Sequence, residues 1–280
     1  MDIKSNTIRR RSNWLLTVFL LFCSLTVLIP MYITLTTAVK DRQQSANSLW
    51  ALPTSWHWDN FSRAIAETGF WRALCNSLLL TAISVILAVL TNSMVAYAIA
   101  RNMNRKGYKF VYYYIVSAMF IPFSILMLPL VKEMSLLGLD NLYGLIPLYV
   151  IYNLPFNTMF YVGYLETIPT SLDEAAMLDG ANTWQTFWCI IFPLMGPANA
   201  TVAILQTLWV WNDFMMPLVM ISKQNQFTIP LTQYMFQSTF NTDYNLSFSS
   251  YTLAMIPMLI VYLFAQKQII GGVAAGSVKE

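Results

Sequence analysis

Six long uncharged runs constrain the fold of this chain more than any other feature. They lie between Arg11 and Lys40, Arg72 and Arg101, Lys109 and Lys132, Asp140 and Glu166, Asp179 and Asp213, and Asp243 and Lys267. Even the shortest, residues 110–131, exceeds the roughly 20 residues that a helix needs to cross about 30 Å of hydrocarbon. Only 10% of residues are charged, against about 25% in a soluble domain. Because the runs lack the alternation of barrel strands, they predict an all-α membrane protein with six transmembrane helices.

The predicted helices differ in how regular they are. They cover about Trp14–Ala38, Ala73–Ala100, Phe110–Val131, Leu142–Leu165, Leu194–Ile221 and Tyr251–Ile270. Pro122 and Pro129 in the third helix, and Pro147 and Pro155 in the fourth, predict kinks. These kinks are either fixed bends in a bundle or hinges around a pathway. The polar and aromatic stretch 222–250 fits either sugar recognition or an outer membrane interface.

The distribution of basic residues predicts the orientation, because Lys and Arg collect on the cytoplasmic side. One side would hold Lys4, Arg9, Arg10, Arg11, Arg101, Arg105, Lys106, Lys109, Lys267 and Lys279, and the other Lys40, Arg42, Arg63, Arg72, Lys132 and Lys223. This places both termini in the cytoplasm. The first run is too long for a signal-peptide core and has no clear A-x-A site, so we expect an uncleaved first helix. Loop 166–193 falls on the same side without a single Lys or Arg, so it departs from the trend.

Metal and redox chemistry are not indicated. Cys23, Cys75 and Cys189 lie in or beside apolar runs without metal-ligand spacing. His57 is the only histidine, and the tryptophans on either side of it are typical of a membrane interface. We therefore expect no metal site and no cofactor in this chain, and its net charge of +3 identifies no nucleic-acid partner.

The acidic stretch EAAMLDGANTWQTFWCIIFPL, residues 174–194, looks at first like a catalytic site. Asp173, Glu174 and Asp179 crowd together there, and no Lys or Arg answers them. No His, Lys or Ser/base pair accompanies these carboxylates, so we predict no catalytic residue. The stretch more plausibly serves as a handle for another protein.

Its local pattern predicts two short helices joined by a sharp turn. Ser171 and Glu174 have the spacing of a capping box at the start of the first helix. Gly180 suits the left-handed position that ends a helix, and Asn182 or Thr183 can cap a second helix that ends near Pro193.

Asp213 is the only acid inside an apolar run. A central carboxylate costs about 2.5–3.5 kcal/mol on insertion scales. Asn212 is a hydrogen-bond donor beside it, and Trp209 is near in sequence. Asp213 is either a polar contact at a translocation path or its gate, or else an inter-helix bond or a group near the outer interface.

The loop resembles the cytoplasmic EAA loop of ABC importer permeases. The matching positions are Glu174, Ala175, Ala176, Asp179, Gly180, Ala181, Phe187, Ile190, Pro193, Leu194 and Pro197. The DGA continuation, IPLYVIYNLPFNTMFYVGYLETIP before it, and WNDF and IIGGVAAGSVKE after it are similar to the carbohydrate branch, in particular MalG-type subunits of maltose-like importers. The resemblance covers nearly the whole chain.

This resemblance implies a type I ABC importer permease fold in a bacterial cytoplasmic membrane. The residues expected to couple to an ATPase are Ser171, Glu174, Ala175, Ala176, Asp179, Gly180, Ala181, Phe187 and Pro193, and those expected at the path or gate are Trp209, Asn212 and Asp213. The implied division is 1–70 for the tail, first helix and outer loop, 71–266 for the permease domain with coupling loop 171–193, and 267–280 for a cytoplasmic tail.

The implied partners are a second permease, two ATP-binding subunits, an extracytoplasmic solute-binding protein and the lipid bilayer. ATP and Mg would be bound by the partner subunits, because this chain lacks the G-x4-G-K-[ST] loop that cradles phosphates. The chain would therefore be a transporter subunit and not an enzyme.

Three alternatives stay open at this point. The solute could be a polyol, a glycerol phosphate or an amino acid. A standalone secondary carrier would show internal repeats and several membrane-embedded charges, which the sequence does not offer. A membrane enzyme lacks a catalytic constellation.

Overall fold

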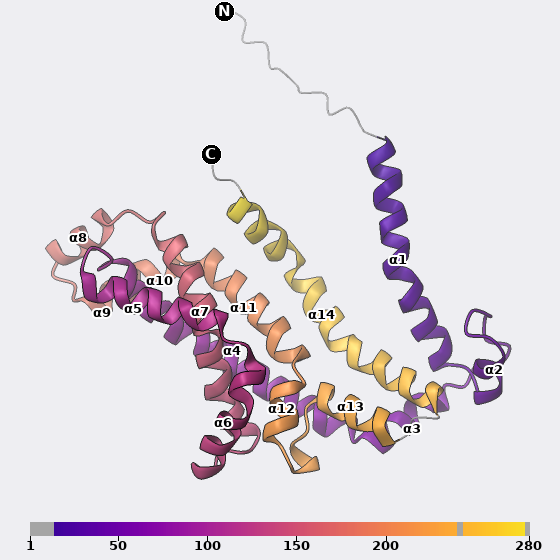
Figure 1. The fold of residues 1–280 in the computed structure, drawn as a ribbon. Coiled ribbons are helices and arrows are strands. Elements are labelled where there is room, and N and C mark those ends of the chain that lie inside the picture. The colour runs from indigo at the N-terminus through magenta and orange to yellow at the C-terminus, as the bar shows by residue number, and fades with distance from the viewer. Residues whose placement is uncertain (1–13, 240–242, 278–280) are drawn as a thin grey trace, which may run out of the picture. The chain divides into compact units, whose positions relative to one another are not determined.

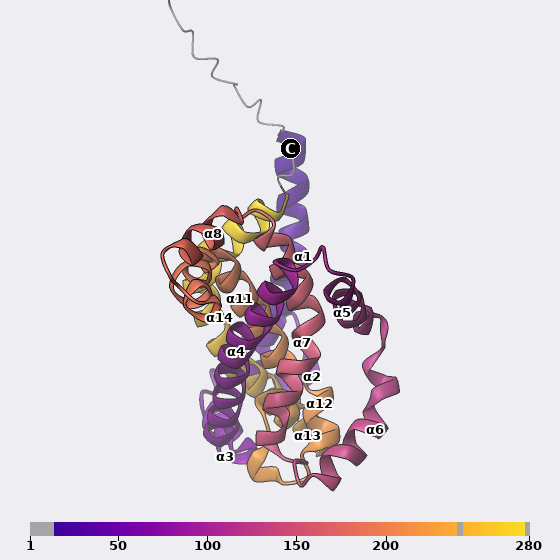
Figure 2. The same cartoon turned by 90° about the vertical axis from the view of Figure 1, so that its left-hand side faces the viewer.

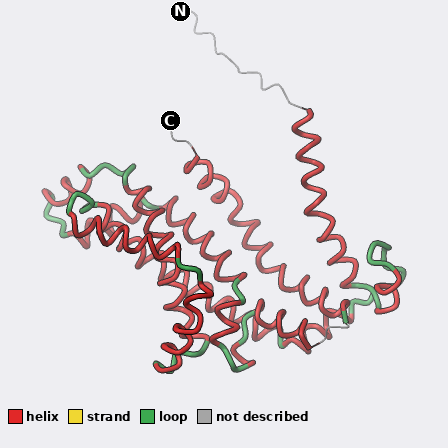
Figure 3. The backbone as a smooth tube through the Cα atoms, in the orientation of Figure 1, coloured by secondary structure: helices red, strands yellow, loops and turns green. Residues whose placement is uncertain are grey.

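The structure, a computed structural model, describes residues 14–239 and 243–277, and all regular elements in these ranges are helices (Figure 3). Two compact units make up the chain: Met1–Ala64 with Phe240–Leu253, and Ile65–Thr239 with Ala254–Glu280. The α-helices are α1 (Trp14–Ala38), α2 (Arg42–Asn47), α3 (Asp59–Thr68), α4 (Phe70–Ala100), α5 (Lys106–Ser117), α6 (Phe123–Leu136), α7 (Leu142–Leu165), α8 (Ser171–Leu178), α9 (Thr183–Thr186), α10 (Phe192–Leu194), α11 (Gly196–Asn212), α12 (Met215–Met220), α13 (Ile229–Thr239) and α14 (Tyr244–Ser277). Between them lie the 3₁₀ turns η1 (Ala118–Phe120) and η3 (Gln224–Gln226) and the π-helical turn η2 (Phe187–Ile191).

In the first unit, two asparagine side chains close the C-terminal end of α1. The last carbonyls of a helix have no partner within it. The Asn60 amide donates to the carbonyls of Ala38 and Lys40, at 3.0 and 2.8 Å. The Asn245 amide donates to those of Thr37 and Lys40, at 3.0 and 2.8 Å. The outer loop thus folds back onto the end of α1 as a small cap.

The second unit is built on α4, α7 and α11, which lie side by side (Figures 1 and 2). The buried face of α4 carries small residues, among them Ser77, Ser84, Ala88 and Ala96. Small residues let helix backbones approach closely, which is how helices associate in a membrane. Helix α4 is therefore shaped to pack against neighbours along most of its length.

Two apolar clusters hold the opposite ends of the α4–α7 pair. The first gathers Tyr97, Leu165 and Ile191 with their neighbours, and the second gathers Leu80 and Leu145 with residues of α12. Between them, buried amides bond across the helices. The buried Asn157 amide donates to Gln206 Oε1 at 3.0 Å, and Gln206 Nε2 donates to the Ser84 carbonyl at 3.4 Å.

The helix bounds agree well with the predictions at two places and poorly at two others. Helices α1 and α7 have the predicted ends. The predicted kink at Pro122 is confirmed, but it is a complete break: α5 and α6 meet there at 103°, so the predicted third helix is not a single element. The predicted fifth helix breaks at Asp213, where the backbone becomes extended before α12 begins.

Three helices among the described residues are long and apolar enough to cross a membrane: Trp14–Ala38, Phe70–Ala100 and Tyr244–Leu263. The number rises to five if the α5–α6 pair and the α9–α11 pair each count as one span. Helix α7 has 24 residues, but its asparagines, tyrosines and prolines lower its hydropathy. The count of six spans stays a prediction. The side chains of the two tails, 1–13 and 267–280, lie outside the described part of the chain.

Candidate functional site

The helical loop that follows α7 turns sharply at Gly180. Its φ is +87°, in the left-handed region that favours glycine. The Ala181 N–H donates to the Ala176 carbonyl at 2.9 Å, and the Gly180 N–H to that of Met177 at 3.1 Å. These two bonds are the Schellman arrangement that satisfies helix-end carbonyls. The predicted role of Gly180 in ending the first helix is confirmed.

The capping box lies at the second helix of this loop. Asn182 Oδ1 accepts from the Gln185 N–H, and Gln185 Oε1 accepts from the Asn182 N–H, both at 2.9 Å. Of the two caps left open by the sequence, Asn182 is therefore the one used. Helical structure then continues through η2 and α10 to Leu194, close to the predicted end, and α11 leaves at a bend of 75°.

The capping box predicted at Ser171 is wrong. The cap position of α8 is Thr170, whose backbone is already helical and whose side chain makes no capping bond. The chain turns one residue earlier, because the Leu172 N–H donates to the Pro169 carbonyl. Glu174 is consequently not used as a cap, and it is exposed.

The predicted coupling residues divide into an exposed set and a buried set. The exposed ones are Ser171, Glu174, Ala175, Asp179, Gly180 and Pro193, while Ala181 is half-buried. Ala176 and Phe187 are buried, and the Phe187 ring packs 5.1 Å from that of Tyr97, centroid to centroid. Phe187 therefore anchors the loop. Leu178, which sequence reasoning missed, is 89% exposed.

Asp173 is the second residue that sequence reasoning missed. It is buried, Tyr97 Oη donates to its Oδ1 at 2.6 Å, and Arg101 Nη2 lies 2.9 Å from its Oδ2. The interpretation that no basic residue answers the acids of this loop is wrong for Asp173. The basic cluster that begins at Arg101 was the available signal, but only the fold brings it to α8.

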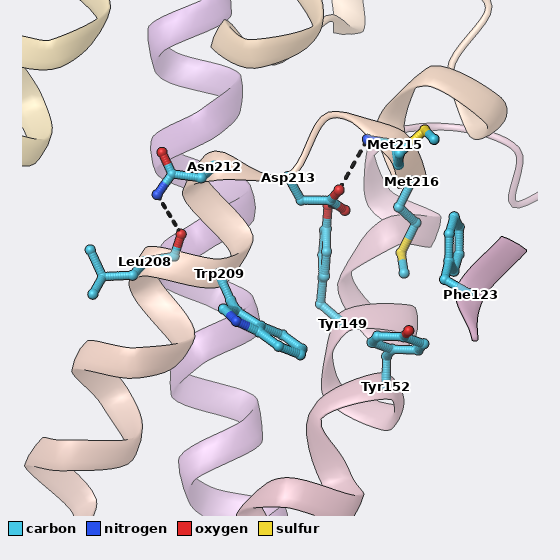
Figure 4. A pocket seen from close by; sticks show the side chains of 9 residues that line it. All are labelled: Phe123, Tyr149, Tyr152, Leu208, Trp209, Asn212, Asp213, Met215 and Met216. Carbon is cyan, nitrogen blue, oxygen red and sulfur yellow. Dashed lines mark hydrogen bonds between the residues drawn. The ribbon is translucent and has the colours of Figure 1, made fainter. Parts of the chain in front are cut away.

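A cavity of about 510 Å³ opens where α11 breaks (Figure 4). It is lined by Phe123, Tyr149, Tyr152, Leu208, Trp209, Asn212, Asp213, Met215 and Met216. Asp213 accepts from Tyr149 Oη at 2.8 Å and from the Met215 N–H at 3.0 Å. The inter-helix bond proposed for Asp213 is thus present, and the same residue also lines the cavity.

Of the two residues predicted to lie near Asp213, Trp209 lines the same cavity, whereas Asn212 makes its hydrogen bond elsewhere. The Asn212 amide donates back to the Leu208 carbonyl at 2.7 Å and not to Asp213, so that part of the prediction is wrong. Trp209 lines the large cavity and also a smaller one of about 110 Å³. The smaller cavity adds the amides of Asn153, Asn157 and Gln206.

The two cavities together present aromatic faces and polar groups along the facing sides of α7 and α11. The Tyr152 and Trp209 rings lie 6.4 Å apart, centroid to centroid. Apolar walls with a few placed polar groups are the usual chemistry of a small-molecule site. Rings beside a carboxylate suit a ligand that has both C–H faces and hydroxyl groups.

The residues of the helical loop and of the cavity all lie within the range that matches a known protein family. Residues 92–273 match the model for the inner membrane component of binding-protein-dependent transport systems. The chain belongs to this family. The resemblance to carbohydrate ABC importer permeases, drawn from the sequence, is thereby confirmed at the level of the family.

Named relatives agree with this assignment. The permease is 41% identical over 256 residues to the multiple sugar-binding transport system permease protein MsmG of Streptococcus mutans, covering 90% of this chain and 92% of that protein. It is 34% identical over 268 residues to the probable starch degradation products transport system permease protein AmyC of Thermoanaerobacterium thermosulfurigenes, covering 96% and 97%.

A solved structure shows the same fold. It is the crystal structure of a bacterial ABC transporter involved in the import of the acidic polysaccharide alginate, with a TM-score of 0.76. The match is 22% identical and covers 95% of this permease and 99% of that chain. At this identity the likeness concerns the fold alone.

Proposed function

We propose that this permease is one of two permease subunits of an ATP-driven importer for carbohydrates, oligosaccharides in particular, in the cytoplasmic membrane of a bacterium. Two ATP-binding subunits would supply the chemistry, and an extracytoplasmic solute-binding protein would deliver the sugar. The observation that carries the proposal is the exposed side of α8 within a chain of this family. Helix α8 is short, ends on the exposed Leu178, and lies beside α9 at one end of the second unit (Figure 1).

The exposed side of α8 has the properties of a docking surface. Glu174 and Leu178 are one helical turn apart and both exposed, so they lie on the same face. Ala175, also exposed, lets another backbone approach closely. Burying a leucine side chain yields about 1.5–3 kcal/mol, which a partner cleft would recover at Leu178. The ATPase is the proposed partner at this face.

Contacts between loops support the proposed orientation. The loops after α4 and after α7 were both predicted to be cytoplasmic, and Arg101 meets Asp173 between them. The ends of the predicted second and fourth helices that would face outward meet the stretch 222–250, because the Leu142 N–H donates to Gln226 Oε1 at 3.3 Å and the Asn76 amide to the Asn225 carbonyl at 3.1 Å. Each pair joins segments assigned to one side of the membrane.

The cavity at the α11 break is the proposed sugar contact. Trp209 and Tyr152 offer faces for the C–H surface of a pyranose ring, and Asp213 offers acceptor oxygens for hydroxyl groups. The names of the sugar-transport relatives support this substrate class. The whole path would be completed by the second permease.

The test is reconstitution of the complete importer with a panel of labelled oligosaccharides, with and without this chain. We expect uptake of at least one sugar that depends on the chain and on ATP. An ATPase that fails to co-purify, or uptake by the chain alone, would contradict the proposal and favour a secondary carrier.

Gly180→Val tests the coupling loop. A side chain at the left-handed φ of Gly180 costs about 1–2 kcal/mol, although no atom lies within 4 Å of the added Cβ. We expect intact insertion and ATP hydrolysis with much reduced uptake, and the same for Glu174→Trp. Gly107→Val is the matched control, because it also faces open space but has an ordinary φ. Normal uptake by Gly180→Val at normal expression would contradict the prediction.

A further inference from the structure

A buried ionic cluster lies where α8 meets the rest of its unit. It consists of Asp173, Tyr97 and Arg101, here called the α8 latch. The side chains of Asp173 and Arg101 are only 9% and 13% exposed, and Tyr97 is buried. One carboxylate oxygen of Asp173 accepts a hydrogen bond from the tyrosine hydroxyl at 2.6 Å, and the other forms an ion pair with Arg101 Nη2 at 2.9 Å without hydrogen-bond geometry.

Arg101 extends the latch to a third helix. Its Nη1 donates to the carbonyls of Leu165 and Ile168, at 3.3 and 3.0 Å. Leu165 is the last residue of α7, whose end carbonyls need outside donors, and Ile168 lies in the connection that follows it. A single guanidinium therefore joins the ends of α4 and α7 to the side chain that α8 turns inward.

The latch also sets which face of α8 points outward. Successive residues of a helix differ by about 100° in direction, so an inward Asp173 turns Glu174 away from the core. Ala176 is buried on the same inner side as Asp173, whereas Glu174, Ala175 and Leu178 are exposed. The rotation of α8 about its own axis thus depends on where the Asp173 carboxylate is held.

We infer that Asp173, Tyr97 and Arg101 are positioning residues for energy coupling, which make α8 move as one body with the ends of α4 and α7. The inference rests on the proposed function, because it assigns a means of transmission to the α8 docking face. A displacement of α8 by the ATPase is then passed directly to α4 and α7, which pack against each other. Without the latch, α8 would be held in place only by the short connection 166–170, the glycine turn and the packing of the buried Ala176.

The physical basis is the cost of separating buried charges. A buried ion pair that loses one partner leaves an uncompensated charge, which is far more unfavourable than losing an exposed pair. The latch therefore resists any movement of α8 that would pull Asp173 away from Arg101. A movement that carries α4 and α7 along leaves the pair intact and avoids that cost.

The experiment compares Asp173→Asn and Arg101→Gln, singly and together, in the full complex with its ATPase, second permease and binding protein. Glu166→Gln and Arg105→Gln are the matched controls, since both residues are exposed neighbours in the same two loops. Three quantities are measured: co-purification of the ATPase, sugar taken up per ATP hydrolysed, and hydrogen exchange of the α8 amides 172–180. Exchange needs no substrate, so it reports on the latch even if the transported sugar has been wrongly assigned.

For Asp173→Asn we expect a complex that still assembles, α8 exchange at least about tenfold faster because a buried ion pair is lost, and a similar fall in sugar per ATP. The double variant should be no worse than the poorer single one, because the two residues act as a pair. Single-variant effects that multiply, or behaviour equal to Glu166→Gln, would overturn the inference. Faster exchange with unchanged sugar per ATP would overturn the transmission role. A wild-type complex that takes up no carbohydrate, while the exchange difference persists, would refute the proposed function and leave the latch standing.

Discussion

Leu178 stands almost free of its own chain, with 89% of its surface exposed at the end of α8. Replacing it by serine removes an apolar side chain whose burial is worth about 1.5–3 kcal/mol. We expect Leu178→Ser to weaken binding of the ATPase subunit by about tenfold or more, measured by titration of the purified permease pair. The helix itself should be unaffected, because the side chain has few contacts within its own chain.

A control for this prediction is available at the other end of the same unit. Leu137 is 68% exposed in the turn after α6, on the side proposed to face outward. Leu137→Ser should leave ATPase binding unchanged. Equal affinities for both variants would show that α8 does not use its apolar tip for docking.

Asp243 ties the start of α14 to the outer loop within the first unit. Burial alone raises the pKa of its carboxyl, but the Arg42 guanidinium at 2.6 Å, the Leu246 N–H and Arg63 together hold that pKa below the usual 3.8. Because Arg42 is 70% exposed, we expect Asp243→Asn to cost only about 1–2 kcal/mol of local stability.

The lowered pKa of the Asp243 carboxyl should make the local stability of the outer loop depend on pH. A carboxyl with a lowered folded-state pKa contributes stability that is fully present above its unfolded value and is lost as the pH falls through the folded value. Hydrogen-exchange protection of α2, residues 42–47, should therefore be constant between pH 7 and 5 and fall only below about pH 4. In Asp243→Asn this acid-dependent loss should be smaller but still present, because Asp41 caps α2 by accepting from the Gln44 N–H at 2.7 Å, and that bond lowers the pKa of the Asp41 carboxyl too. A loss of protection already between pH 7 and 5 would contradict the assignment.

At the level of helices, the sequence was sufficient wherever a run ended on a strong local signal. Helix α7 begins after Asn141, whose side chain accepts from the N–H groups of Tyr143 and Gly144. Helix α1 ends just before Lys40, where the apolar run stops. Such ends carry a signal in the adjacent residues, and that is why they were predicted at the observed positions, even though Asn60 and Asn245 also bond to the end of α1.

Some of the misplaced features depend on residues far away in the chain. Pro217 lies four residues after Asp213 and has no N–H to donate to the Asp213 carbonyl, so the break has a local signal. The Asp213 carboxylate, however, is held by Tyr149, 64 residues earlier. The Asp173–Arg101 pair is likewise a contact between two loops. Periodicity and capping rules see only local sequence, so the glycine turn of the candidate site was predictable but its buried half was not.

The role of the junction between α11 and α12 can be tested by replacing the two residues that bond across it, Tyr149 and Asp213. Tyr149→Phe removes only the hydroxyl that donates to Asp213, whereas Asp213→Ala also removes the carboxylate from the cavity. If the carboxylate contacts sugar hydroxyls, Asp213→Ala should raise the KM for uptake by about tenfold, and Tyr149→Phe should change it much less. Unchanged substrate-stimulated transport in Asp213→Ala would restrict this residue to a structural role.

For the whole molecule, the proposed topology can be tested by labelling. A cysteine introduced at Asn104 or Leu137, in a variant without Cys23, Cys75 and Cys189, should react differently with an impermeant maleimide. We expect labelling at position 137 in intact cells, and at position 104 only after the membrane is permeabilised, because Lys and Arg near Asn104 retain that loop inside. The reverse pattern would invert the orientation and exclude α8 as the docking site for a cytoplasmic ATPase.

The break at Asp213 has a consequence for solvent. Within hydrocarbon every backbone polar group needs a partner, and irregular backbone is tolerated only beside protein or water. The Trp209 carbonyl is paired with the Asp213 N–H, but an opened helix end leaves the carbonyls after it without helical partners. We expect water in the adjoining cavity of about 510 Å³ to bond to them. A sugar that binds in this cavity would then replace that water with its own hydroxyl groups.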